Sequence, residues 1–372
     1  MSSTVADGAA PQRPPAIIVS ERSLFWRRFR RHKLAMAGLA VTLLLYLIAL
    51  LAEPIAPFDP DHGNARLVYH PPQAIHWFDG GGLRPYVVAY RLARDPATLA
   101  ATYVPDPNRE VYLGVWVKGD PYTVWGLFSG SHHLFGPLDP RQPVFLLGAD
   151  RLGRDMLSRI VFGARASLSI GLVGVTFSLL LGIIFGGISG YFGGRIDWAV
   201  QRVIEFIISL PTIPIWLALA AALPKSWSPL TTYFCITLII SLIAWTELAR
   251  VVRGRFLAIR SEAYVTAAWL DGCSQARIIF RHMLPSLTSH IIASVTLAIP
   301  MMILAETALS FLGLGLQPPA ISWGALLKEA QDVNSLAEAP WLLLPGGAVA
   351  ITVLALNFLG DGLRDAADPH GS

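Results

Sequence analysis

Apolar residues are concentrated in six segments, each long enough to cross a lipid bilayer. The first covers residues 34–52 and contains almost no polar side chain. As a helix at about 1.5 Å per residue it extends roughly 28 Å, close to the thickness of the hydrocarbon core. Five similar segments follow at residues 167–188, 203–223, 231–248, 289–312 and 341–359. The pattern predicts an all-α integral membrane protein with six transmembrane helices, of which the third is kinked at Pro211 and Pro214.

Composition agrees with a membrane protein. Of the 372 residues, 53% are hydrophobic and only 15% are charged, whereas a soluble domain carries about 25% charged residues. The net charge is +4, and the basic residues cluster beside the apolar segments. Because such clustering is typical of membrane topology, we expect the lipid bilayer as a partner and no nucleic acid.

Basic residues also predict the orientation. Six of them precede the first span, and six arginines lie between the fourth and fifth spans: Arg22, Arg27, Arg28, Arg30, Arg31 and Lys33, then Arg250, Arg253, Arg255, Arg260, Arg277 and Arg281. Positive residues stay on the cytoplasmic side, so we expect a cytoplasmic tail over residues 1–33, mobile over its first 20 residues, and a cytoplasmic loop over residues 249–287. A multi-pass protein with both termini in the cytoplasm follows. The alternative of a cleaved signal peptide is disfavoured, because no small-x-small site follows the first span.

The first span, residues 34–52, is followed by a long polar segment over residues 53–160, and a transmembrane core with the remaining spans follows over residues 161–369. We expect the polar segment to be extracytoplasmic, because long loops are translocated regardless of charge. Alternation of apolar and polar residues at 110–117 predicts a strand, so we expect a β-rich insertion over about residues 62–140. His132 and His133 would point to opposite faces of a strand. We interpret the histidines of this segment as solvated and predict no metal site.

Residues 262–285 form a polar stretch between two spans and predict two short helices joined at Gly272. Residues 262–270 contain good helix formers, and glycine supplies the backbone freedom that a helix end requires. Ser274 is a candidate cap for a second helix over residues 275–284, which Pro285 would terminate. Ile278, Ile279 and Phe280 give this helix an apolar side. A helix–glycine–helix projection of this kind suits docking into a groove on a partner.

The same stretch resembles the EAA motif of ABC-importer permeases, through Ala267, Ala268, Gly272, Leu284 and Pro285. In that family the loop is the coupling helix, which sits in a cleft of the ATPase subunit. Thr266 stands where the family usually has Glu, so the acidic contact is lost here or has moved to Glu262 or Asp271. The resemblance implies that the ATPase-coupling residues are Glu262, Thr266, Ala267, Ala268, Asp271, Gly272, Arg277, Arg281, His282, Leu284 and Pro285.

Three further segments, at residues 147–168, 310–324 and 360–369, resemble the C-type subunit of dipeptide, oligopeptide and nickel permeases. The resemblance implies the type I ABC importer permease fold, and the insertion after the first helix is similar to one in oligopeptide-type permeases. The pattern of residues 147–168 predicts an interfacial helix before the second span. Its candidate interfacial residues are Asp150, Arg154, Asp155, Arg159 and Arg165.

Three acidic residues fall in or beside the spans. Glu205 and Glu247 have arginines nearby, Arg202 and Arg250, so we interpret both as structural ion pairs. Glu306 lies deeper, just before Ser310 and Phe311. Glu306, Ser310 and Phe311 are candidates for the pathway or for gating. A helix-packing role for Glu306 is an equal alternative.

The sequence contains no Gly-x-x-x-x-Gly-Lys-Ser/Thr phosphate loop, so we expect no enzyme and no cofactor in this chain. The resemblance implies a permease of an ATP-driven importer for peptides or related small solutes in the bacterial cytoplasmic (inner) membrane. It also implies a B-type permease partner, two ATPase subunits that bind ATP and Mg, and an extracytoplasmic solute-binding protein. Alternatives are nickel or another solute in the same type of complex, an ATPase-independent secondary carrier, or a scaffold subunit. The solute and the role of the insertion stay open.

Overall fold

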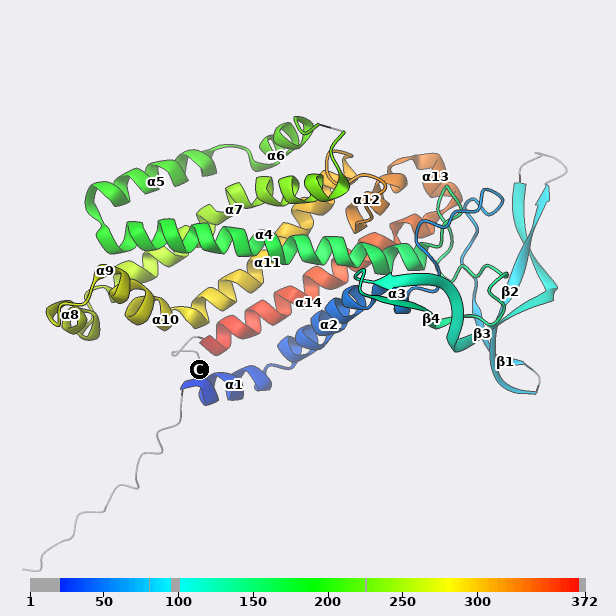
Figure 1. The fold of residues 1–372 in the computed structure, drawn as a ribbon, viewed down its shortest axis with the longest axis horizontal. Helices are drawn as coiled ribbons and strands as arrows, with labels where there is room; N and C mark the ends of the chain where they lie inside the picture. Colours follow the sequence, from blue (N-terminus) through cyan, green and yellow to red (C-terminus); the bar gives the residue numbers. More distant parts are fainter. Residues whose placement is uncertain (1–20, 80, 95–100, 225, 368–372) are drawn as a thin grey trace, which may run out of the picture.

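The structure, a computed structural model, describes residues 21–79, 81–94, 101–224 and 226–367. Residues 1–20, which were expected to be mobile, lie outside the described residues. Residues 368 and 369, the last two of the 360–369 segment, also lie outside them. The molecule is elongated, with long helices at one end and a small β-sheet at the other (Figure 1). A basic helix, α1 (Glu21–Arg31), precedes the first long helix.

Among the described residues, five helical segments are long and apolar enough to cross a membrane. They are α2 (Lys33–Leu50), α4 (Met156–Phe192), α7 (Pro229–Ile259), α11 (Thr288–Phe311), and η3 (Pro340–Leu343) together with α14 (Leu344–Ala367). A bent pair, α5 (Gly194–Ser209) and α6 (Thr212–Ala221), brings the number to six if it forms one span. The protein is therefore mostly helical, as expected.

The third predicted span is broken rather than kinked. Helices α5 and α6 meet at an angle of 83°. The break falls at Leu210, whose backbone is extended (ψ 139°) because the ring of Pro211 disfavours the helical conformation in the residue before it. Pro214 lies in the first turn of α6, where a proline is tolerated. The sequence predicted the site of the bend but not its size.

The expected interfacial helix before the second span does not form a separate element, since residues 156–166 are the first turns of α4. The side chain of Asp155 caps this helix by accepting a hydrogen bond from the Ser158 N–H (2.8 Å). Residues 53–160 also contain the short helix α3 (Ala52–Ile55), directly after the first span.

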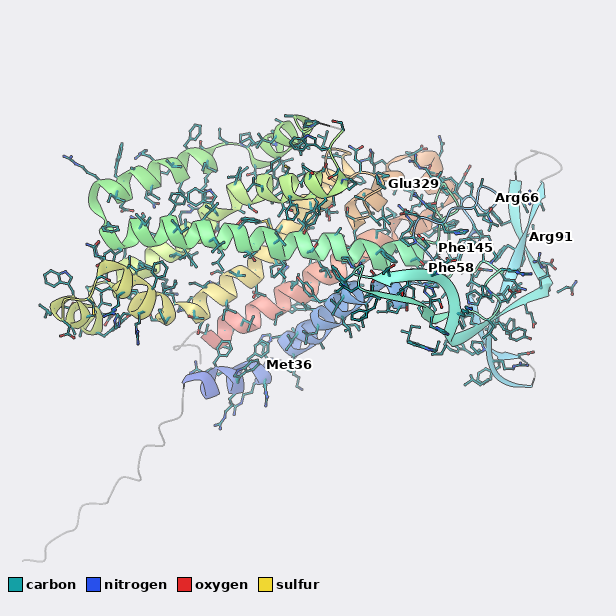
Figure 2. The ribbon with its side chains drawn as sticks, viewed as in Figure 1. Met36, Phe58, Arg66, Arg91, Phe145 and Glu329 are labelled. Atoms are coloured by element: carbon teal, nitrogen blue, oxygen red, sulfur yellow. The ribbon has the colours of Figure 1, made fainter. Side chains whose placement is uncertain are left out.

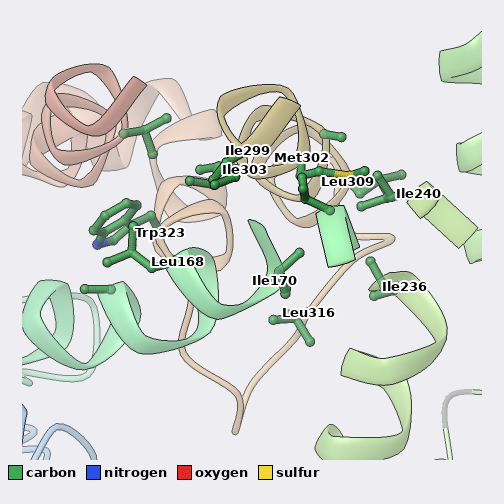
Figure 3. Close-up of a cluster of buried hydrophobic side chains, with 14 of the residues drawn as sticks. Leu168, Ile170, Ile236, Ile240, Ile299, Met302, Ile303, Leu309, Leu316 and Trp323 are labelled. Carbon is green, nitrogen blue, oxygen red and sulfur yellow. The ribbon is translucent and has the colours of Figure 1, made fainter. Parts of the chain in front are cut away.

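Glycines allow the long helices to approach closely. A Cβ added to Gly186 would lie 2.4 Å from the Ala249 carbonyl oxygen, and one added to Gly182 would lie 2.8 Å from the Leu248 side chain. Because the spacing of four residues puts both glycines on one face of α4, α7 packs against that face. The main apolar core joins α4, α7, α11 and α14, and Figure 3 shows Trp323 beside Leu168 within it.

The polar segment after the first span contains a four-stranded antiparallel sheet in the order β1-β2-β3-β4. Its strands are β1 (Ile75–Asp79), β2 (Gly82–Arg94), β3 (Ala101–Val124) and β4 (Phe128–Pro137). The strand predicted at residues 110–117 is confirmed as part of β3. Phe58 and Phe145 lie where the sheet meets the helices (Figure 2).

The histidines of this segment are not uniformly solvated. His132 is exposed and His133 is buried, which confirms that they face opposite sides of β4. The ring of His133 is hydrogen-bonded to the Ala56 and Asp120 carbonyl oxygens. His70 is also buried, against Tyr90, Tyr103 and Phe145. The expectation of solvated histidines was wrong for these two because backbone carbonyl groups satisfy their ring nitrogens.

Candidate functional site

The polar stretch at residues 262–285 begins with α8 (Ala263–Leu270), as predicted. The helix ends in a Schellman motif. The Gly272 N–H donates to the Trp269 carbonyl oxygen (3.1 Å), and the Cys273 N–H donates to that of Ala268 (3.1 Å). Gly272 has a φ of +73°, in the left-handed region that side chains disfavour. The predicted glycine bend is therefore confirmed.

The second half of the stretch is helical but irregular. Ser274 caps α9 (Gln275–Arg277), and a π-helix, η1 (Ile278–Met283), and α10 (Leu284–Ser286) follow. The prediction that Pro285 terminates the helix was wrong. Pro285 lies in the first turn of α10, where its missing N–H is not required. The chain then enters α11 at Thr288, so this loop is joined almost directly to a long apolar helix.

An apolar cluster fixes the loop to one end of the long helices. Val265, Ala268 and Ile278 of the loop are buried together with Val252 and Phe256 of α7. A displacement of α8 would therefore be transmitted to α7 through this packing contact. It would be transmitted to α11 through the polypeptide chain that joins the two helices.

The opposite side of the loop is open. Trp269, Leu270 and Phe280 are largely exposed, so Phe280 does not belong to the buried side formed by Ile278. The polar and small coupling candidates that reach the surface on this side are Glu262, Thr266, Ala267, Asp271, Gly272, Arg277 and Arg281, with Pro285 at its end. His282 and Leu284 are half-buried, and Ala268 is buried. Their coupling role stays a prediction.

Glu306 lies at the centre of a buried polar cluster that joins three parts of the chain. Its side chain has 0% exposure. Its carboxylate accepts hydrogen bonds from the hydroxyl groups of Ser310 (2.7 Å) and Ser167 (3.3 Å). The Ser167 hydroxyl in turn accepts a hydrogen bond from the backbone N–H of Trp323 (3.1 Å). The cluster therefore ties α4 and α11 to the segment that leads into α12 (Trp323–Leu327).

These contacts favour helix packing for Glu306, one of the two roles that the sequence left open. Ser310 is likewise buried and accepts the Leu316 N–H (2.9 Å). Phe311, the third gating candidate, is 36% exposed. Among these three residues only Phe311 reaches the surface of the chain, and its gating role stays a prediction.

The candidate interfacial residues gather into an ion-pair cluster at the start of α4. Arg154 contacts the Asp150 carboxylate at 2.7 Å, and Arg159 lies 3.5 Å from the same carboxylate. Asp155 is buried beside them, and burial raises its pKa to about 6. The nearby Arg151 N–H donates to Glu329 (2.7 Å), whose pKa burial also raises (Figure 2).

Arg165, the fifth candidate, lies two turns further along α4. Its guanidinium is paired with Glu53 of α3 (2.7 Å). The five residues thus link α4 to the segments that flank the sheet, and their interfacial role stays a prediction.

Comparison with known proteins identifies the family. Residues 179–370 match the family described as binding-protein-dependent transport system inner membrane component, and residues 20–72 match the N-terminal TM domain of oligopeptide transport permease C. The chain belongs to the binding-protein-dependent transport permeases.

Individual relatives cover nearly the whole permease. The oligopeptide transport system permease protein OppC of Bacillus subtilis is 30% identical over 357 residues, which is 94% of this chain and 92% of the relative. The di/tripeptide transport system permease protein DppC of Pseudomonas aeruginosa is 32% identical over 362 residues, 97% of this chain and 96% of the relative. Among solved structures, a chain of the MetNI methionine ABC transporter is 17% identical, with a TM-score of 0.44 over 57% of this chain and 97% of that one.

The acidic residues in the spans of the permease are paired as predicted. Glu205 lies 2.8 Å from Arg202, and Glu247 lies 3.6 Å from Arg250. All four side chains are exposed on the chain. Both pairs join residues three apart in one helix, so neither pair holds two helices together.

Sequence reasoning missed an ion pair that joins α5 to α7 in the permease. Asp197 of α5 pairs with Arg253 of α7 and also accepts a hydrogen bond from Ser189 of α4 (2.5 Å). The sequence carried one clue, since Asp197 is an isolated acid between the second and third predicted spans. The choice of Arg253 among the six inner arginines depends on packing between α5 and α7, which local pattern does not contain.

Proposed function

We propose that this chain is the permease subunit of an ATP-driven importer for peptides or related small solutes. The proposal rests on one observation, the alignment of more than nine-tenths of the chain with permeases named for oligopeptide and di/tripeptide transport. A transport subunit rather than a catalytic one is consistent with the sequence, which has no phosphate loop. ATP and Mg would be bound by partner ATPase subunits.

The proposed topology has six spans, with α5 and α6 forming the third. Both termini and residues 249–287 are in the cytoplasm, and the sheet is on the outer side of the bacterial inner membrane. The arginines of α1 and of the inner segment support this orientation. The sheet and the inner segment also lie at opposite ends of the long helices, as the orientation requires (Figure 1).

We propose that the exposed side of α8 and η1 docks into a cleft of an ATPase subunit. The exposed apolar side chains of Trp269, Leu270 and Phe280 supply contact area, and Arg277 and Arg281 supply charge. Thr266 lacks a carboxylate. The acidic contact to the ATPase would therefore come from Glu262 at the start of α8 or from Asp271 at its end. Closure of the ATPases would then move α7 and α11 as rigid bodies.

The exposed ion pairs support a proposal for the surface that faces the solute. Charged side chains in apolar spans are found where they face a water-filled cavity or a protein partner rather than lipid. Glu205 and Glu247 are exposed on α5 and α7. We propose that these two helices line the translocation path together with a B-type permease.

The deciding experiment combines purification with uptake. The tagged chain is purified from native membranes, and co-purifying proteins are identified by mass spectrometry. We expect a second permease, P-loop ATPases and a solute-binding protein. Uptake of a labelled tripeptide is then measured in cells that lack the chain and in cells complemented with it. Recovery of the chain alone would contradict the importer, and normal tripeptide uptake without it would contradict the peptide substrate.

A further inference from the structure

The loop between β3 and β4 has an unusual backbone. Its turn is closed by the Leu127 N–H, which donates to the Val124 carbonyl oxygen (2.9 Å). Trp125 and Gly126, the two central residues, have φ values of 51° and 71°. Such turns favour asparagine, aspartate or glycine at both positions, and a bulky residue with a positive φ is an outlier. A tryptophan held in this conformation points to a constraint on where its ring must lie.

The ring of Trp125 is fastened to the end of the first span. Its indole N–H donates to the carbonyl oxygen of Leu50, the last residue of α2 (3.1 Å). The Arg165 guanidinium lies over the same ring, 4.2 Å from its centroid, and pairs with Glu53. Figure 1 shows the β3–β4 hairpin curving from the sheet toward this end of α2. The turn is thus held at the depth where the apolar helix ends.

Two large apolar side chains that follow the tryptophan are largely exposed. Leu127 is 77% exposed and Phe128 is 71% exposed. Neighbouring Leu50 is exposed as well, and it continues a row of exposed leucines on α2 formed by Leu43, Leu44 and Leu47. Through the bond of Trp125 to Leu50, the turn adjoins a surface of the first span that lies inside the bilayer by length and composition.

We infer that the turn formed by residues 124–128 is a lipid-interfacial anchor. It buries Leu127 and Phe128 at the boundary between headgroups and acyl chains, at the end of α2 remote from α1. Tryptophan and arginine are enriched at this level of a membrane, because each combines an apolar body with a polar group that reaches headgroups and water. The occupant is lipid rather than a protein, since the turn adjoins the membrane-spanning surface at the depth where aromatic belts occur. The anchor fixes the sheet relative to the first span and does not depend on which solute is carried.

Photo-crosslinking in native membranes tests this assignment. p-Benzoylphenylalanine replaces Phe128 in the full chain, in cells supplied with phospholipid whose acyl chains carry an alkyne tag. Phe78 is the matched control, because it is a phenylalanine of similar exposure (74%) on β1, at the far end of the sheet. Leu44 on α2 is the reference for a lipid-facing position. After irradiation, tagged lipid attached to the chain is detected by coupling a fluorophore to the alkyne.

We expect lipid adducts at position 128 at a level within about threefold of those at position 44 and at least about tenfold above those at position 78. Adding Trp125→Ala should lower the adduct at 128, because the turn is no longer held at the end of α2. Equal labelling at 128 and 78, or an adduct of position 128 to another protein, would overturn the assignment. An adduct at 44 with none at 128 would do the same. Size-exclusion profiles of the purified variants separate these outcomes from misfolding.

Discussion

The carboxylate of Asp197 accepts two hydrogen bonds from the guanidinium of Arg253, at 2.5 Å and 2.6 Å. Paired bonds of this kind between a guanidinium and a carboxylate are strong and fix geometry. Asp197 lies in the first turn of α5, Arg253 lies toward the C-terminal end of α7, and α7 carries the apolar contact with α8. The pair therefore connects α5 to α7, the helix that packs against the loop over residues 262–285.

Replacing Arg253 with alanine should weaken this inner junction. We expect a loss of roughly 1 to 2 kcal/mol, since the pair is charged but partly open to solvent. The thermal midpoint of the purified protein should fall, and uptake should fall with it. Arg250→Ala is the matched control, because its pair with Glu247 is longer and exposed, and it should change the midpoint little. Equal effects of the two changes would contradict a special role for Arg253.

Gly272→Val should impair coupling without preventing membrane insertion. A Cβ at this position meets no atom within 4 Å, so the cost comes from the positive φ alone. That cost is about 1 to 2 kcal/mol, enough to reduce the population of the native bend roughly 5- to 30-fold. Uptake and ATPase co-purification measure the effect.

The control for this change is Gly254→Val in α7. Here too a Cβ would meet open space, but the residue lies within a helix and has no positive φ. Gly254→Val should therefore retain most activity. If Gly272→Val transports at the wild-type rate, the bend is not needed for coupling.

Removing the Glu306 carboxylate should loosen the contact between α4, α11 and α12. In Glu306→Ala, the buried hydroxyl groups of Ser167 and Ser310 lose their acceptor, and each unpaired group costs about 1 to 3 kcal/mol. Glu306→Gln keeps the shape and one acceptor oxygen, so its thermal midpoint should lie between those of wild type and Glu306→Ala. We expect uptake to follow the same order.

A neighbouring residue provides the control for the Glu306 changes. The buried hydroxyl of Thr307 has no hydrogen-bond partner in the described part of the chain. Thr307→Val should thus leave the midpoint unchanged or raise it. A loss of stability in Thr307→Val as large as in Glu306→Ala would show that the site responds to any change in packing.

The sequence predicted the features that depend on local chemistry. Apolar length located α2 and α11 to within a few residues, and Gly272 marked the bend after α8. It failed at the start of α4, because hydropathy marks the part of a helix inside the membrane, whereas the helix begins at its cap, Asp155. That cap was visible in the sequence as an Asp followed three residues later by Ser158.

The rest depends on contacts between distant residues. Ser167 and Glu306 are separated by 139 positions, so no local pattern could show that a costly buried acid is satisfied by serines of other segments. Pro211 marked a bend, but the 83° angle depends on how α6 packs afterwards. The burial of His70 and His133 likewise depends on how the sheet folds against the helices.

The buried ring of His70 makes the stability of the outer segment dependent on pH. The ring packs against Tyr90, Tyr103 and Phe145, and its Nδ1 lies 2.8 Å from the Pro71 carbonyl oxygen. Burial disfavours the charged imidazolium and lowers the pKa of His70 to about 4. In the unfolded chain the pKa of histidine is about 6.5. Between these values the unfolded chain binds a proton that the folded chain does not bind.

Stability should therefore fall as the pH is lowered from about 6.5 to about 4, by at most about 3 kcal/mol from this residue. Asp155 acts in the opposite direction, because its pKa is raised to about 6 and protonation favours its folded form. His70→Phe removes only the histidine contribution. The thermal midpoint of this variant should decline less between pH 7 and pH 4.5 than that of wild type, whereas His132→Phe, which changes an exposed histidine, should follow wild type. A decline in His70→Phe as steep as in wild type would show that His70 is not the group that titrates.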